Sequence, residues 1–199
     1  MTDKRPTLEE LRAEIDRIDT ILHDLIMERT QIIDKVSQVK KRERVKIRPS
    51  REAEMLYRLS SRHQGKFPKQ VLFRIWREII SGTLTLEGPF CVAIQTPHEN
   101  TGYVDLARDH YGSYSEISCH KSAVDVMSAI ASDQAAVGIL PFPVQDSRDD
   151  WWHSLSQFDQ DEDSIRIVAR LPFFGRSSAL GANLDALVIS YAAPVETER

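Results

Sequence analysis

Cysteine is scarce in this sequence of 199 residues, which contains only Cys91 and Cys119. A single disulfide between them is possible, but two distant cysteines favour a reduced protein and have no metal-site spacing. No apolar run approaches the length of about 20 residues that a membrane span needs. The N-terminal segment is charged and has a helical pattern, so we expect no secretory signal and a cytoplasmic location.

Positive charge is not in excess either. Lysine and arginine together number 26 and aspartate and glutamate number 30, which gives a formal net charge of −4. Proteins that bind nucleic acids are usually basic, so we expect no nucleic-acid partner. His98, His110 and His120 have no ligand spacing, and we expect neither a metal nor a cofactor. The 41% hydrophobic and 28% charged residues are typical of a globular protein.

The chain divides into two parts of different composition. Residues 1–88 have few turn signals and predict helices, whereas residues 89–199 hold most of the 9 prolines and 8 glycines. The pair Gly88-Pro89 combines a residue typical of a helix C-terminus with one that cannot continue a helix. We therefore predict an all-helical domain over 1–88 and a small α/β domain over 89–199.

The first predicted helix is long and has a heptad pattern. Thr7 and Glu10 form a capping box that predicts its start. A helix of roughly 35 residues is about 50 Å long, too long to be covered by the rest of the helical part. The spacing therefore predicts a partner helix from a second copy of the chain, and so a homodimer. The positions of the heptad, which Arg29 interrupts, are Leu8, Leu11, Ile15, Ile18, Leu22, Leu25, Ile32, Val36 and Val39.

Two shorter helices are predicted after the first. One covers residues 51–64 and ends at Gly65, and the other covers residues 68–87. On the second of these, Thr83 and Glu87 are four residues apart on the face of an apolar stripe, which contains Leu72, Ile75, Trp76, Ile79 and Ile80.

Cations cluster at helical spacing in this part of the chain. Arg29 and Lys40 project from the same stripe as Val36. A buried cation costs several kcal/mol unless a partner or water meets it, so these positions predict a pocket. The pocket would suit a compact ligand with two carboxylates. Arg29 could also merely set the helix register, and the basic run over 35–48 could be a solvated surface. The other polar groups that would line it are Arg48, Arg51, Glu52, Thr83 and Glu87.

Four stretches together are similar to one known family. They are "LRAEIDRID", Arg29 with Lys40, "RPSREAEML" and "REIISGTLTLE", and they resemble the all-helical class of chorismate mutases over residues 7–87. The resemblance implies an intertwined dimer of three-helix chains, joined through the first helix. It also implies the rearrangement of chorismate to prephenate, in phenylalanine and tyrosine biosynthesis, without a cofactor or metal.

The resemblance implies a role for each matched residue. Arg29 would bind a substrate carboxylate, and Arg12 would reach in from the partner chain. Lys40 and Glu87 would both hydrogen-bond the ether oxygen whose bond breaks. The remaining matched residues are Arg48 and Glu52, which would hold the ring hydroxyl, Thr83, which would contact the ring carboxylate, and Arg51, which would support the pocket from behind.

The second part of the chain predicts strands alternating with helices. The order strand, helix, strand, helix, strand over residues 90–141 predicts a parallel α/β unit, and two further strands are predicted over 164–175 and 185–194. The unit resembles the first lobe of prephenate dehydratase. It has "PFPV" where dehydratases have a Pro-Ile-Glu-Asn-Ser-like stretch, and no Thr-Arg-Phe motif. We therefore expect this domain to be non-catalytic. Residues 146–163 are expected to form an exposed loop with a packed tryptophan.

Two other functions stay open at this point. One is an isochorismate pyruvate-lyase on the same helical fold, and the other is a regulatory dimer without turnover. The nearly full set of matched pocket positions favours an enzyme, and the dehydratase-like second part favours the mutase.

Overall fold

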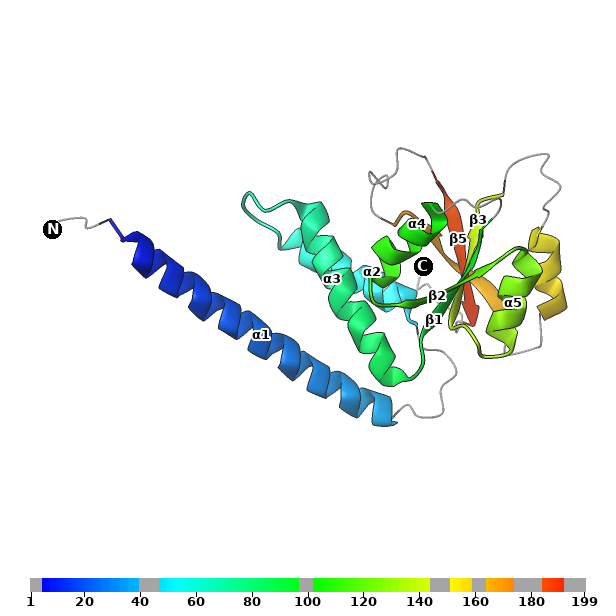
Figure 1. Cartoon of the computed structure of the whole chain (residues 1–199), viewed down its shortest axis with the longest axis horizontal. Helices are drawn as coiled ribbons and strands as arrows, with labels where there is room; N and C mark the ends of the chain where they lie inside the picture. Colours follow the sequence, from blue (N-terminus) through cyan, green and yellow to red (C-terminus); the bar gives the residue numbers. More distant parts are fainter. Residues whose placement is uncertain are drawn as a thin grey trace, which may run out of the picture. The chain divides into compact units, whose positions relative to one another are not determined.

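The protein is described here from a computed structural model, which covers residues 5–39, 47–96, 102–143, 151–158, 164–173 and 184–191. The chain separates into two compact units, residues 1–41 and 42–199 (Figure 1). No helix among the described residues is both long and apolar enough to cross a membrane.

The first unit is one helix, α1, over Leu8–Val39. The predicted capping box is confirmed, because the Thr7 amide donates to Glu10 Oε2 at 2.7 Å and the Glu10 amide donates to Thr7 Oγ1 at 3.2 Å. No residue of α1 is buried. The apolar residues of its heptad are all at least 39% exposed, so an apolar stripe that is interrupted at Arg29 stands uncovered along the helix.

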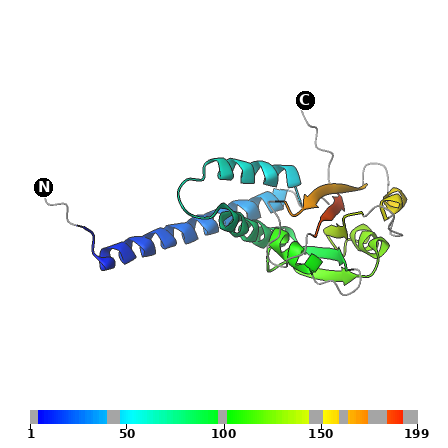
Figure 2. The same cartoon turned by 90° about the horizontal axis from the view of Figure 1, so that it is seen from above.

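The second unit begins with a helical hairpin (Figure 2). Helix α2 covers Pro49–Ser61 and α3 covers Lys69–Leu84. Helix α2 ends earlier than predicted, and the Ser61 hydroxyl donates to the Arg58 carbonyl in its last turn, at 2.8 Å. The predicted α-helix to residue 87 is also wrong at its end, because Thr85–Glu87 form a 3₁₀ turn, η1. Gly88 follows with φ at +124°, which confirms the predicted glycine stop.

The rest of the second unit is built around a five-stranded sheet, with the strands in the order β2-β1-β3-β5-β4. Strand β1 pairs in parallel with β2 and β3, as predicted, while β5 lies antiparallel to both β3 and β4. The bounds of the strands are Cys91–Gln95 for β1, Glu116–His120 for β2, Val137–Pro141 for β3, Ile165–Leu171 for β4 and Ala186–Tyr191 for β5.

Two helices cover opposite faces of this sheet (Figure 1). Helix α4, over Gly102–Tyr111, packs on the face that carries Val92 and Ile94, and α5, over Ala123–Ala131, packs on the face that carries Ala93. The alternation along β1 follows from the two-residue period of a strand. The predicted α/β architecture is thus confirmed.

The acidic segment after β3 is not the simple loop that we predicted. Residues Trp151–Phe158 form a 3₁₀ helix, η3. The expected tryptophan anchor is correct, since Trp151 is buried and its Nε1 donates to the Pro141 carbonyl at 3.2 Å.

Polar contacts join α3 to α4 and to the turn that follows it. Arg74 forms an ion pair with Asp109 at 2.9 Å, and the Glu78 carboxylate accepts from the Ser113 amide at 3.0 Å. Gly112 lies between these contacts with φ at +80°, and a Cβ added there would lie 2.1 Å from Ser81 Oγ. The hairpin therefore packs on the α/β region at a point where only glycine fits.

Replacing Gly112 should therefore weaken the second unit. We expect Gly112→Ala to lower the free energy of unfolding by about 2 kcal/mol, because the new methyl group meets Ser81 in a left-handed backbone conformation. Gly82→Ala is the matched control, since Gly82 is helical and a Cβ there would meet nothing within 4 Å. It should stabilise the protein by about 0.5–1 kcal/mol. Urea unfolding of both variants measures the difference, and equal stabilities would contradict this account of the interface.

Candidate active site

The predicted site residues lie on several elements. Arg12 and Arg29 lie on α1, in the first unit, and Lys40 lies outside the described residues. Residues from Arg48 onward lie in the second unit. The structure therefore tests the local surroundings of the second group, and the convergence of the two groups stays a prediction.

Arg48 and Glu52 stand together at the start of α2. Arg48 is the N-cap residue, and its carbonyl accepts from the Glu52 amide at 3.0 Å. Pro49 occupies the first helical position, where its fixed φ favours the helical turn. The side chains of Arg48 and Arg51 are exposed, whereas the Glu52 side chain is only 18% exposed. The first turn of α2 thus turns one carboxylate inward.

Thr83 and Glu87 lie where α3 gives way to η1. Thr83 is buried, and its hydroxyl donates to the Ile80 carbonyl at 2.7 Å. Its oxygen lone pairs stay available as acceptors. Glu87 is half-buried on η1, so the two residues are not on successive turns of one α-helix as predicted.

Glu52 has a partner that the sequence analysis did not identify. Arg77 Nη1 on α3 lies 2.8 Å from Glu52 Oε2, with the two side chains 7% and 18% exposed. Arg77 was missed because it stands off the apolar stripe of its helix, where a cation usually faces water. The available signal was the spacing of Arg74, Arg77, Glu78 and Ser81, which gives α3 a second, polar face.

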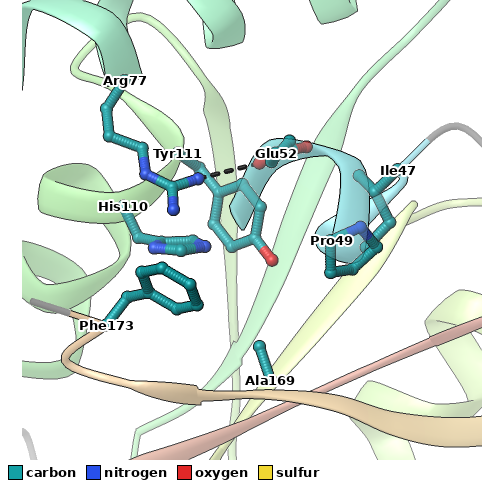
Figure 3. A pocket seen from close by; sticks show the side chains of 8 residues that line it. All are labelled: Ile47, Pro49, Glu52, Arg77, His110, Tyr111, Ala169 and Phe173. Carbon is teal, nitrogen blue, oxygen red and sulfur yellow. Dashed lines mark hydrogen bonds and ion pairs between the residues drawn. The ribbon is translucent and has the colours of Figure 1, made fainter. Parts of the chain in front are cut away.

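The ion pair lines a small pocket that opens to solvent (Figure 3). Aromatic rings from the α/β region surround the guanidinium, which lies 5.3 Å from the centre of the Phe173 ring. His110 and Tyr111 on α4 complete this wall, with their rings 4.7 Å apart. The other lining residues are Ile47, Pro49 and Ala169.

Burial dominates the electrostatics of this pocket. It raises the pKa of Glu52, and the Arg77 charge and hydrogen bond oppose that rise. Burial also lowers the pKa of Arg77, and Glu52 opposes it. The pKa of His110 lies well below its usual value because of burial and the nearby Arg77 charge, and burial raises the pKa of Tyr111. The pair is thus held among groups that stay neutral near pH 7.

The described site residues are suited to binding and orienting an anion rather than to covalent chemistry. Guanidinium groups recognise carboxylates through paired hydrogen bonds, and a buried carboxylate accepts from a hydroxyl. Among the described residues, no three His, Cys, Asp or Glu side chains are grouped so that they could hold a metal ion. The arrangement therefore fits a reaction that depends on positioning and electrostatic stabilisation.

The comparisons with known proteins agree with this chemistry. The chain is 34% identical over 141 residues to the bifunctional chorismate mutase/prephenate dehydratase of Stutzerimonas stutzeri. It is 32% identical over 139 residues to the protein of the same name from Aquifex aeolicus, and 33% identical over 141 residues to that from Pseudomonas aeruginosa.

Each of these matches covers 67% of this chain and 38% of the relative. Two thirds of the chain is more than its helical part contains, so the similarity extends into residues 89–199. The family model described as "Chorismate mutase type II" matches residues 11–88. Residues 11–88 of this chain are therefore a chorismate mutase type II domain.

Proposed function

We propose that the chain is a chorismate mutase, which rearranges chorismate to prephenate in the cytoplasm for phenylalanine and tyrosine biosynthesis. The observation that carries this proposal is the family match over residues 11–88, together with the cations and acceptors that the chain has at the matched positions. The relatives' names contain the same activity. Residues 89–199 are proposed to be a separate, non-catalytic α/β domain.

The proposed reaction is pericyclic and needs no nucleophile. The protein must fold the enolpyruvyl arm over the ring and stabilise negative charge on the ether oxygen. A rate increase of about 10⁶-fold corresponds to about 8 kcal/mol. Arg29 and the partner chain's Arg12 are proposed to hold the carboxylates, and Lys40 and Glu87 to donate to the ether oxygen. Arg48 and Glu52 would hold the ring hydroxyl, and Thr83 would contact the ring carboxylate.

The reaction products provide the first test. The purified chain should convert chorismate to prephenate and form no phenylpyruvate at neutral pH, because residues 89–199 lack the dehydratase motifs. Chromatography of the products against a no-enzyme control checks both statements. Phenylpyruvate formed only in the presence of the enzyme would contradict the expectation that residues 89–199 are non-catalytic. Release of pyruvate from isochorismate, without turnover of chorismate, would identify a lyase instead.

A homodimer through α1 is proposed from the exposed apolar stripe of that helix. Arg12→Ala and Arg29→Ala should each be nearly inactive, because each removes one cation from both shared sites. After subunit exchange the mixture should recover about a quarter of the parent activity, since half of the dimers are mixed and each has one intact site. Steady-state rates and native mass spectrometry of the mixture make the measurement. Proven exchange without recovery would rule out shared sites.

The proposed role of Glu87 as a donor to the ether oxygen predicts how turnover depends on pH. A carboxylate has no proton to donate, so only the protonated acid can stabilise charge on the ether oxygen. The value of kcat/KM should therefore be highest on the acidic side and fall as the pH rises. Glu87→Gln supplies a permanent N–H donor and should flatten the fall. The profile is measured for both proteins with circular dichroism at each pH, and an equally steep fall in the variant would exclude this role.

A further inference from the structure

Arg77 is one of the residues through which the α/β region contacts the helical hairpin of α2 and α3. On one side its guanidinium is 2.8 Å from Glu52 on α2, and on the other it lies over the ring of Phe173, which follows β4, at 5.3 Å from the ring centre. His110 and Tyr111 of α4 enclose the same pocket (Figure 3). The guanidinium therefore contacts both parts of the chain at once.

We propose that Arg77 is a positioning residue, by which the α/β region holds the Glu52 carboxylate in place for the ring hydroxyl of the substrate. This inference rests on the proposed function, because Glu52 is a substrate-binding residue only if the chain binds chorismate. Arg77 itself is not proposed to touch the substrate. It acts by fixing the position and the charge of its neighbour.

The contacts around Glu52 determine the position of its carboxylate. Glu52 is in the first turn of α2, where its backbone is fixed by the Arg48 carbonyl. Its side chain could still rotate, and the hydrogen bond from Arg77 at 2.8 Å selects one orientation. A planar guanidinium packed on an aromatic ring is a rigid donor, so little freedom is left to the acceptor. The second carboxylate oxygen, Oε1, can accept another hydrogen bond.

The charge of Glu52 depends on its burial and on Arg77. Desolvation alone favours the neutral acid, and the nearby guanidinium counteracts it. Among the described residues that line the pocket, Glu52 is the only acid, and Arg77 is the only one that carries a positive charge at neutral pH. Without Arg77, the pKa of Glu52 would rise further, which favours the neutral acid, a poorer hydrogen-bond acceptor than the carboxylate.

A second ion pair on the same helix provides the matched control. Arg74 and Asp109 also join α3 to α4, with an N–O distance of 2.9 Å. Their side chains are 58% and 33% exposed, and neither lines the pocket. Exposed pairs contribute little to stability. Arg74→Gln thus removes a cation from the same interface without touching Glu52.

The experiment compares the kinetics of the full chain with five variants, namely Arg77→Gln, Arg77→Lys, Glu52→Gln, the Arg77→Gln/Glu52→Gln double variant and the control Arg74→Gln. We expect Arg77→Gln to lower kcat/KM about tenfold, mainly through KM, since a hydrogen bond to a charged group contributes on that order. Arg77→Lys should recover part of the loss because it keeps the positive charge. Arg74→Gln should leave both constants unchanged.

The pH profile separates positioning from general damage. As the pH increases, the ratio of kcat/KM between Arg77→Gln and the parent should rise, because Glu52 regains its charge as the pH passes its raised pKa. Dividing by the parent removes the contribution of Glu87. The pocket's other titratable groups, His110 and Tyr111 on α4, are unchanged in both proteins. The rise should be absent when the double variant is divided by Glu52→Gln.

The double variant decides between the outcomes. If Arg77 acts through Glu52, Arg77→Gln should have little further effect on kcat/KM once Glu52 is glutamine. An undiminished effect in that background, or normal kinetics of Arg77→Gln, would overturn the inference. If Arg77→Gln does not fold, the double variant, which leaves no unpaired buried charge, is compared with Glu52→Gln in the same way. An inactive parent chain would instead contradict the proposed function itself.

Discussion

The ion pair between Arg77 and Glu52 is the interaction on which the arrangement of the second unit depends. Leaving one buried charge unpaired costs about 3–5 kcal/mol, so α2 and α3 must stay close enough to keep the pair together. The same guanidinium packs on Phe173 and lies beside α4. The orientation of the helical hairpin and its contact with the sheet therefore share one electrostatic constraint.

Helix α4 packs against two surfaces. Leu106 and Ala107 pack into the core of the sheet, while Asp109 and the turn at Ser113 meet α3. Gly112 allows the close approach, since no side chain fits beside Ser81. An α/β region that lacks the dehydratase motifs could thus still influence the proposed site beside it, through packing rather than through chemistry.

Helix α1 differs from these helices, because its side chains are not buried. It makes its own capping box and has helical periodicity throughout, but it buries no residue. An uncovered apolar stripe of this length is a surface that a second helix would stabilise, because burying apolar area contributes roughly 25 cal/mol per Å². The proposed dimer accounts for both the stripe and the cations within it. The partner's helix would cover the apolar stripe, and the arginines of both chains would bind the substrate.

Local and periodic features could be predicted from the sequence alone. The heptad, the Thr7 capping box, the glycine stop at Gly88 and the alternation of strands and helices depend on short-range geometry, and the structure shows them. The residues of the family motif were assigned through the resemblance to chorismate mutases, and their roles stay proposals. The burial of Arg77 could not be predicted from the sequence. A cation off the apolar stripe of its helix is expected to face solvent, and only the folded chain places α4 and Phe173 against it. The 3₁₀ turn before Gly88 likewise depends on how the last turn of α3 tightens its hydrogen bonds. Tertiary structure alone decided which polar residues lost their water, since desolvation depends on neighbours that are distant in the chain.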